Sequence, residues 1–187
     1  MPDVSFLFRE PSFSFLFFTG NVCDVVPELL ANCGYDVTVG HRRSESTFFE
    51  ISDAIRRMEG PRNIAYKAVY QVPGGTVLLD PEMTVGSYKD EIIESCSEHG
   101  IEVFVAIWER FSQSILCAHL APGGASVDVC VMEGVMQGDA VNPPPSFLKQ
   151  TDPACLKMFL VAAGVPLDAI FGKVSARVYK LTVSSEQ

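Results

Sequence analysis

The sequence predicts an α+β fold, with a mainly antiparallel sheet of at least five strands and helices packed on one face. Most β-like segments follow one another through tight turns and do not alternate regularly with helices, as they would in a parallel sheet. Two Pro-Gly-Gly sequences, at 73–75 and 122–124, each separate two such segments and predict hairpins in which both glycines occupy the turn. Helix start and stop signals mark four further segments.

Eight segments rich in β-branched and aromatic residues are expected to form strands. They cover residues 12–18, 35–39, 64–72, 76–80, 101–109, 115–121, 125–132 and 173–183. The three segments between residues 101 and 132 are close enough in sequence to form a three-stranded meander. A short turn at residues 167–171 precedes the last strand.

Each predicted helix has boundary residues that would cap or terminate its backbone hydrogen bonding. The helices and their signals are 24–33, with Asp24 as N-cap and Gly34 as stop; 47–59, with a Thr47–Glu50 capping box; 88–99, between Ser87 and Gly100; and 152–163, starting at Asp152-Pro153.

The 187 residues are expected to form a single domain, 1–187. The Pro-rich segment 134–151 contains Pro143-Pro144-Pro145 and is the one long loop, which is either functional or a linker. The segment that follows it is too short for an independent core, so it should pack against the sheet.

The charge balance is acidic, with 14 Lys and Arg against 23 Asp and Glu and a net charge of −9. Such a field disfavours non-specific binding to nucleic acid or to an anionic membrane and favours basic partners. Hydrophobic residues make up 48% of the chain, which excludes an intrinsically disordered protein.

We expect a cytoplasmic protein, because the apolar N-terminal stretch lacks a basic segment and its longest nearby apolar run, residues 15–18, is too short for a bilayer. The six cysteines are expected to be free thiols, since no C-x-x-C and no zinc-like Cys/His spacing occurs. The chain therefore predicts no metal site, and the missing nucleotide-binding fingerprints predict no cofactor. The cysteines are Cys23, Cys33, Cys96, Cys117, Cys130 and Cys155.

The second predicted hairpin contains a candidate catalytic group. A Gly123-Gly124 turn would place His119 opposite Asp128 and Cys117 opposite Cys130, on one face of the sheet. A thiol beside a histidine oriented by an aspartate suits nucleophilic catalysis, and the same groups could hold a metal ion. The simpler interpretation is a half-exposed sheet face with one cross-strand ion pair.

The third predicted helix has a candidate partner-binding face. Its acidic residues recur at helical spacing and are expected to point outward: Asp90, Glu91, Glu94 and Glu98. Like charges four residues apart repel one another, and a basic partner would relieve that repulsion. The alternative is a solvated face of an acidic protein.

A weaker signal is His41-Arg42-Arg43, placed between a strand end and a helix start. Arginines beside helix N-terminal amides can hold a phosphate or carboxylate, but an ordinary loop is the simpler explanation of the cluster.

Two functional hypotheses result. The first is a non-enzymatic protein-interaction module that masks a basic partner, for example as an acidic inhibitor or immunity-type protein. The second is a small enzyme or ligand-binding protein that uses the Cys117/His119/Asp128 face, with the long loop as a lid. A concave pocket at those three side chains would favour the second hypothesis.

Overall fold

The computed structural model describes residues 12–58, 61, 63–85, 88–109, 114–132, 135–136 and 160–183, with the backbone alone at 114, 125–132 and 135–136. The strands are β1 (Ser12–Thr19), β2 (Tyr35–Thr47), β3 (Ile64–Val72), β4 (Gly75–Leu79), β5 (Val103–Glu109), β6 (Ser114–Ala121), β7 (Gly124–Met132), β8 (Val135–Met136) and β9 (Lys173–Val183). The helices are α1 (Val26–Asn32), α2 (Phe48–Arg56), α3 (Lys89–His99) and α5 (Leu167–Phe171).

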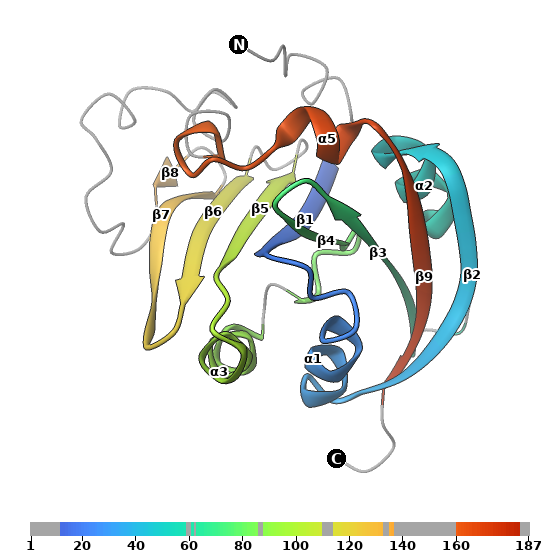
Figure 1. Ribbon diagram of the computed structural model, residues 1–187, viewed down its shortest axis with the longest axis horizontal. Helices are drawn as coiled ribbons and strands as arrows, with labels where there is room; N and C mark the ends of the chain where they lie inside the picture. Colours follow the sequence, from blue (N-terminus) through green and yellow to red (C-terminus); the bar gives the residue numbers. More distant parts are fainter. Residues whose placement is uncertain are drawn as a thin grey trace.

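The described strands form one nine-stranded sheet in the order β2-β9-β3-β4-β1-β5-β6-β7-β8 (Figure 1). All pairings between them are antiparallel. The α+β class with a mostly antiparallel sheet is therefore confirmed, and β5, β6 and β7 form the expected meander.

The central strand β1 is apolar on both faces of the sheet. Phe13, Phe15 and Phe17 belong to one buried cluster, while Leu16 and Phe18 belong to a second cluster on the opposite face. Successive side chains of a strand point to opposite faces, so a strand covered on both sides must be apolar at nearly every position. This explains why the run from 15 to 18 shows no alternation with polar residues.

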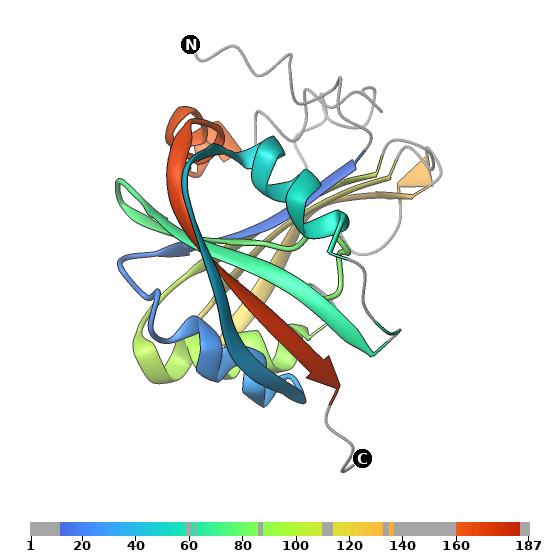
Figure 2. The ribbon, with the colours of Figure 1, turned by 90° about the vertical axis from the view of Figure 1, so that its right-hand side faces the viewer.

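Helices cover both faces of the sheet, so the prediction of helices on one face was wrong. Helices α2 and α5 contribute to the cluster that contains Phe13, whereas α1 and α3 contribute to the cluster that contains Leu16. Figures 1 and 2 show α1 and α3 together on one side of the sheet and α2 and α5 on the other. The apolar stripe of each helix requires a covering surface, but it does not specify which face of the sheet supplies it.

Strand β9 brings the end of the chain between two earlier strands. It pairs with β2 on one side and with β3 on the other, and Figure 2 shows β2 and β9 running side by side across the molecule. Strand β2 extends to Thr47 instead of ending near Val39, because β9 pairs with it as far as Lys173. This extension places the expected loop at His41-Arg42-Arg43 within a strand.

The two hairpin turns use Pro-Gly, and the predicted Gly-Gly turns were wrong. Val72 pairs with Gly75 and Ala121 pairs with Gly124, so Pro73-Gly74 and Pro122-Gly123 occupy the turns. Only the first glycine of each pair has a positive φ, +83° at Gly74 and +86° at Gly123. Proline followed by a glycine with φ near +80° is the pattern of a type II turn.

The expected helix boundaries were right where the signal was a capping box or a C-terminal glycine. Helix α2 has the Thr47–Glu50 capping box, and Gly100 ends α3 in the left-handed conformation. At α1 the N-cap is Val25, without a side-chain hydrogen bond, so Asp24 does not cap it. The predicted caps Ser87 and Asp152, with most of the helix 152–163, lie outside the described residues.

The expected long loop begins with a short strand. Residues 135–136 form β8, which pairs with β7 through Val131↔Met136 and Met132↔Val135. The rest of the predicted loop lies outside the part of the chain that the structure describes.

Candidate functional site

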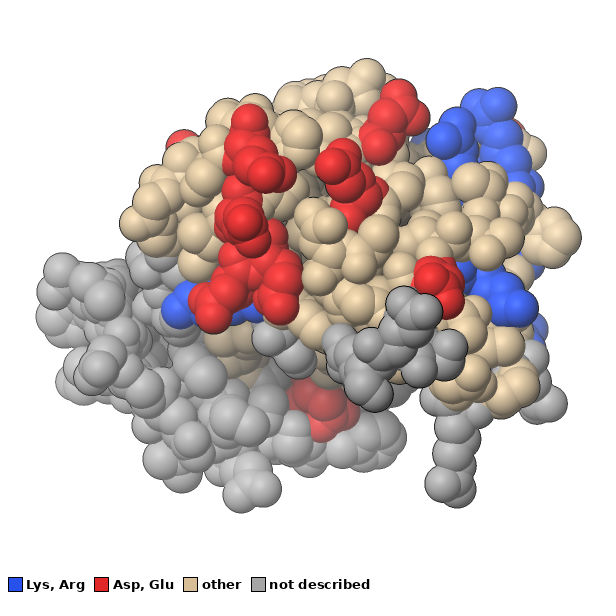
Figure 3. All heavy atoms as spheres, turned by 90° about the horizontal axis from the view of Figure 1, so that it is seen from below, with Lys and Arg blue, Asp and Glu red and all other residues tan. Residues whose placement is uncertain are grey.

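The outer face of α3 has three exposed carboxylates. Asp90, Glu94 and Glu98 are exposed and follow one another at intervals of four residues. None of the three forms an ion pair with a described Lys, Arg or His side chain. Figure 3 shows a stripe of acidic side chains on the side of the molecule where α1 and α3 lie. We call these three residues the acidic face.

Glu91, the fourth acid predicted for this face, is less exposed than the other three. It is half-buried, and its charge adds to the effect of burial in raising the pKa of the Cys33 thiol to about 12. Helices α1 and α3 pack against each other, so the side of α3 that carries Glu91 is turned toward a neighbour. Helical spacing alone could not distinguish this side from the exposed one.

His119 pairs with a residue other than the one predicted. Its Nε2 lies 3.0 Å from Glu102 Oε2, and its ring stacks on Phe104 with ring centres 4.6 Å apart. The Pro-Gly turn shifts the register of the hairpin, so Ser126 lies opposite His119 and the predicted pairing with Asp128 was wrong. The side chain of Asp128 is outside the description.

Cys117 is on the same face of the sheet as His119 and Phe104, as strand alternation predicted. It is fully buried and belongs to the cluster beneath α2 and α5. The register places Val129 opposite Cys117, so the predicted facing pair of Cys117 and Cys130 is absent. A nucleophilic thiol must reach its substrate, and in this geometry the Cys117 side chain has no route to solvent.

The basic cluster His41-Arg42-Arg43 lies on the edge strand β2. Arg42 pairs with Arg177 of β9 by register, within the strand and before its end at Thr47, where α2 begins. Arg177 donates to the Tyr179 hydroxyl at 3.3 Å, which raises the pKa of the Arg177 guanidinium. The cluster is thus part of a basic sheet edge and lacks the geometry expected of an anion-binding loop.

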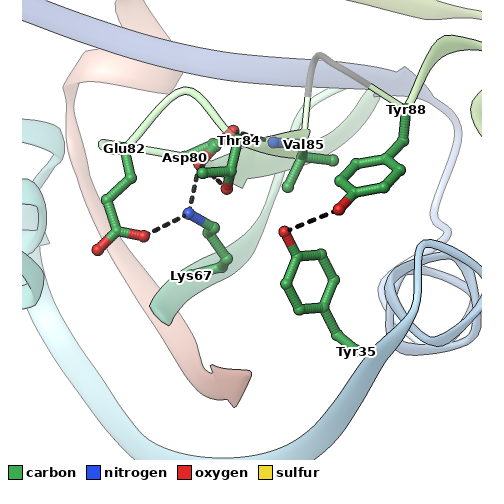
Figure 4. A network of polar contacts seen from close by, with 7 residues as sticks. All are labelled: Tyr35, Lys67, Asp80, Glu82, Thr84, Val85 and Tyr88. Carbon is green, nitrogen blue, oxygen red and sulfur yellow. Dashed lines mark hydrogen bonds and ion pairs between the residues drawn. The ribbon is translucent and has the colours of Figure 1, made fainter. Parts of the chain in front are cut away.

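Sequence reasoning missed a buried ionic network around Lys67 (Figure 4). The ammonium of Lys67 forms ion pairs with Asp80, which is also fully buried, and with Glu82 at 2.9 Å. Asp80 also accepts hydrogen bonds from the Val85 backbone N–H at 2.7 Å and the Thr84 hydroxyl at 3.3 Å. These contacts join β3 to residues 80–85, which precede α3.

Two tyrosines continue the polar contacts toward the start of α3. The Tyr88 hydroxyl, at the N-cap of α3, donates to the Tyr35 hydroxyl of β2 at 3.4 Å, and their rings meet edge to face. Burial, followed by this hydrogen bond, raises the pKa of Tyr35. The start of α3 is therefore held by contacts with both β2 and the network around Lys67.

A signal for this network was present in the sequence. Lys67 is the only charged residue of the strand at 64–72, and Asp80 directly follows the apolar run 77–79. A charge within a strand that is otherwise apolar requires a buried partner. Since the two residues are adjacent across the β3–β4 hairpin, strand pairing could have joined them.

No group of three or more His, Cys, Asp or Glu side chains arranged to hold a metal ion occurs among the described residues. The helices in this part of the chain all lack the combination of length and apolar character needed to cross a bilayer. No family model, curated protein or solved structure matches the chain.

Proposed function

We propose that this protein is a non-enzymatic interaction module that binds a basic protein through the acidic face of α3. The observation that carries the proposal is the exposure of three carboxylates on one side of a helix, without ion-pair partners among the described residues. Like charges four residues apart on a helix destabilise it slightly, and a cationic partner would reverse that effect. An inhibitor or immunity-type protein that neutralises a basic enzyme is one form of such a module.

The charge of the whole chain supports this function. The net charge of −9 adds a long-range negative field to the local field of the acidic face. Fields of this kind raise the rate at which an oppositely charged protein associates, and the gain falls as salt is added. The expected signature is therefore kinetic and dependent on ionic strength.

The packing and hydrogen-bond contacts of α3 favour a preorganised surface. The α3 side chains of Ile92 and Cys96 are fully buried, and Tyr88 at the start of the helix is hydrogen-bonded to Tyr35. A helix held in place loses little conformational freedom on binding, which lowers the entropic cost of association. This distinguishes the acidic face from a flexible acidic tail.

The test begins with capture of partners by the full chain at low salt, followed by identification and purification of a basic partner. Association and dissociation rates are then measured for the wild type and for a triple variant, Asp90→Lys, Glu94→Lys and Glu98→Lys. We expect association to slow by about 10-fold or more at about 50 mM salt and the difference to shrink at about 500 mM. Dissociation should change less.

The matched control has the same change in net charge at exposed acids on other elements, namely Glu45→Lys, Asp53→Lys and Asp168→Lys. It should slow association less than the α3 variant does, because the added positive charge lies away from the acidic face. Equal rates for wild type and α3 variant at low salt would overturn the proposal, as would equal effects of the two triple variants.

A further inference from the structure

A cavity of about 400 Å³ opens at the bulge in edge strand β2, apart from the acidic face. Its volume is within the range of small-molecule sites. It is lined by residues of β2, β3 and β9 and by Met58, which follows α2: Thr38, Val39, Gly40, His41, Met58, Tyr66, Val178 and Lys180.

The bulge shapes this cavity. Between the pairs Val39↔Tyr179 and Arg42↔Arg177, β2 has two residues, Gly40 and His41, opposite the single residue Val178. A Cβ at Gly40 would stand 2.9 Å from the Val178 carbonyl oxygen, so only glycine allows the strands to approach this closely without a shift. Bulges are frequent beside binding sites because they interrupt strand pairing and redirect side chains.

The lining combines an apolar wall with positive charge. Met58, Tyr66 and Val178 supply apolar surface. Lys180 is half-buried and has no ion-pair partner among the described residues. The eight lining residues include Lys180 and His41 but neither Asp nor Glu.

The surrounding charges also favour an anion. Strands β2 and β9 and helix α2 hold six Lys and Arg residues and four Asp and Glu residues: Arg42, Arg43, Arg56, Lys173, Arg177 and Lys180 against Asp36, Glu45, Glu50 and Asp53. Arg57, which caps α2, pairs with Asp53, and Arg177 lies 3.9 Å from Asp24, so these two charges are partly neutralised. The nearest acidic residue on β2 is Asp36, which pairs with Thr182, whereas the lining residue Thr38 pairs with Lys180.

We propose that this cavity binds a small apolar carboxylate, with its hydrocarbon body against Met58 and Tyr66 and its carboxylate on Lys180. Lys180 supplies the ammonium group of the cavity lining, and a partly desolvated ammonium–carboxylate contact is stronger than a neutral hydrogen bond. The flexible, unbranched Met58 side chain would adapt to the ligand body. This site is independent of the proposed interaction with a basic protein.

The test is a titration of the full chain, labelled with ¹⁵N, with 3-phenylpropanoate, 3-phenylpropanamide and 3-phenylpropan-1-amine, followed by amide chemical shifts. The acid should cause saturable shifts at residues 38–41, 66, 178 and 180. A probe of this size is expected to bind with a Kd on the order of 1 mM. The neutral amide and the amine should bind at least about fivefold more weakly, because only the acid carries the charge that Lys180 selects.

Three variants locate the site. Lys180→Gln should weaken binding of the acid about fivefold or more and leave that of the amide nearly unchanged. Lys173→Gln, an exposed lysine of the same strand outside the cavity lining, should leave both affinities unchanged. Thr38→Trp, at an exposed lining position, should fill the cavity and abolish saturable binding while the spectrum remains that of a folded protein.

The proposal is overturned if the acid and the amide bind equally well, if Lys180→Gln leaves the affinity for the acid unchanged, or if the shifts map to other elements. Because the acidic face is not involved, the triple Lys variant of α3 should bind 3-phenylpropanoate as the wild type does. A failure at this cavity would therefore leave the proposed interaction with a basic protein untouched.

Discussion

The side chains of Lys67 and Asp80 form an ion pair in which neither residue is accessible to solvent. The pair joins β3 to the segment that leads from β4 to α3. Removing two charges from water costs several kcal/mol per ion, and this cost is recovered only where the remaining hydrogen-bonding groups are satisfied. Here Asp80 has two further donors, Val85 N–H and Thr84 Oγ1, and Lys67 has a second carboxylate in Glu82.

Breaking this pair should destabilise the fold strongly. Lys67→Met leaves the buried Asp80 carboxylate without its cation, and we expect a loss of about 3–5 kcal/mol in the free energy of unfolding. Glu82→Gln is the matched control, since that side chain is 44% exposed and its ion pair should contribute less than about 1 kcal/mol. Urea unfolding of both variants measures the difference.

The double variant Lys67→Met with Asp80→Asn separates pairing from burial. The double variant should lose less free energy of unfolding than the sum of the two single variants, because neither partner is left as an isolated charge. If Lys67→Met lowers the free energy of unfolding no more than Glu82→Gln does, the buried pair does not stabilise the fold in the expected way.

The second glycine of each Pro-Gly-Gly sequence has different surroundings in the two hairpins, and alanine substitutions test this difference. A Cβ at Gly75 would overlap the Phe17 ring and the Phe18 carbonyl oxygen, whereas a Cβ at Gly124 meets no atom within 4 Å. Gly75→Ala should therefore destabilise by about 1–3 kcal/mol or more through overpacking. Gly124→Ala should be neutral or slightly stabilising, since it reduces the entropy of the unfolded chain.

Thermal unfolding of the two alanine variants gives the comparison directly. A difference of this size shifts the unfolding midpoint of Gly75→Ala by several degrees relative to Gly124→Ala. Equal midpoints would mean that β4 can move away from Phe17 without cost, which would contradict the close packing at the centre of the sheet.

The capping box of α2 should make stability depend on pH. The Thr47 backbone N–H donates to the Glu50 carboxylate at 2.7 Å, and this hydrogen bond, followed by that of the Thr47 hydroxyl, lowers the pKa of Glu50. A carboxyl group with a lower pKa in the folded state stabilises the fold above its unfolded pKa, about 4.3. That contribution is lost as the pH falls through the folded value.

Glu50→Gln should therefore be less stable than the wild type at pH 7, and the difference should shrink below about pH 4. Thr47→Ala removes the other half of the box and should cost about 1 kcal/mol at neutral pH. Both effects are measured by unfolding curves between about pH 3 and about pH 7, a range that includes the unfolded glutamate pKa of about 4.3. A constant difference between Glu50→Gln and the wild type across this range would contradict the role of the ionised carboxylate.

Local sequence determined the features that depend on neighbouring residues. The Thr47–Glu50 capping box, the Gly100 stop and the last strand at Lys173–Val183 lie where the sequence predicts them. Capping needs contacts only three residues apart, and strand composition reflects the immediate surroundings of the backbone. The same holds for the spacing of the acids on α3, which helical periodicity supplies.

Only the tertiary structure decided which of these elements meet. Strand β2 extends through His41–Arg43 because β9, more than 120 residues later, pairs with it, and Glu91 is half-buried on a helix that packs against α1. Ser126 lies opposite His119 because a type II turn, and not the expected Gly-Gly turn, sets the register of β6 and β7, and the pairing of β5 with β6 brings Glu102 to His119. Periodicity specifies which side of an element is apolar, but the face it covers and the partner it binds depend on contacts between distant segments.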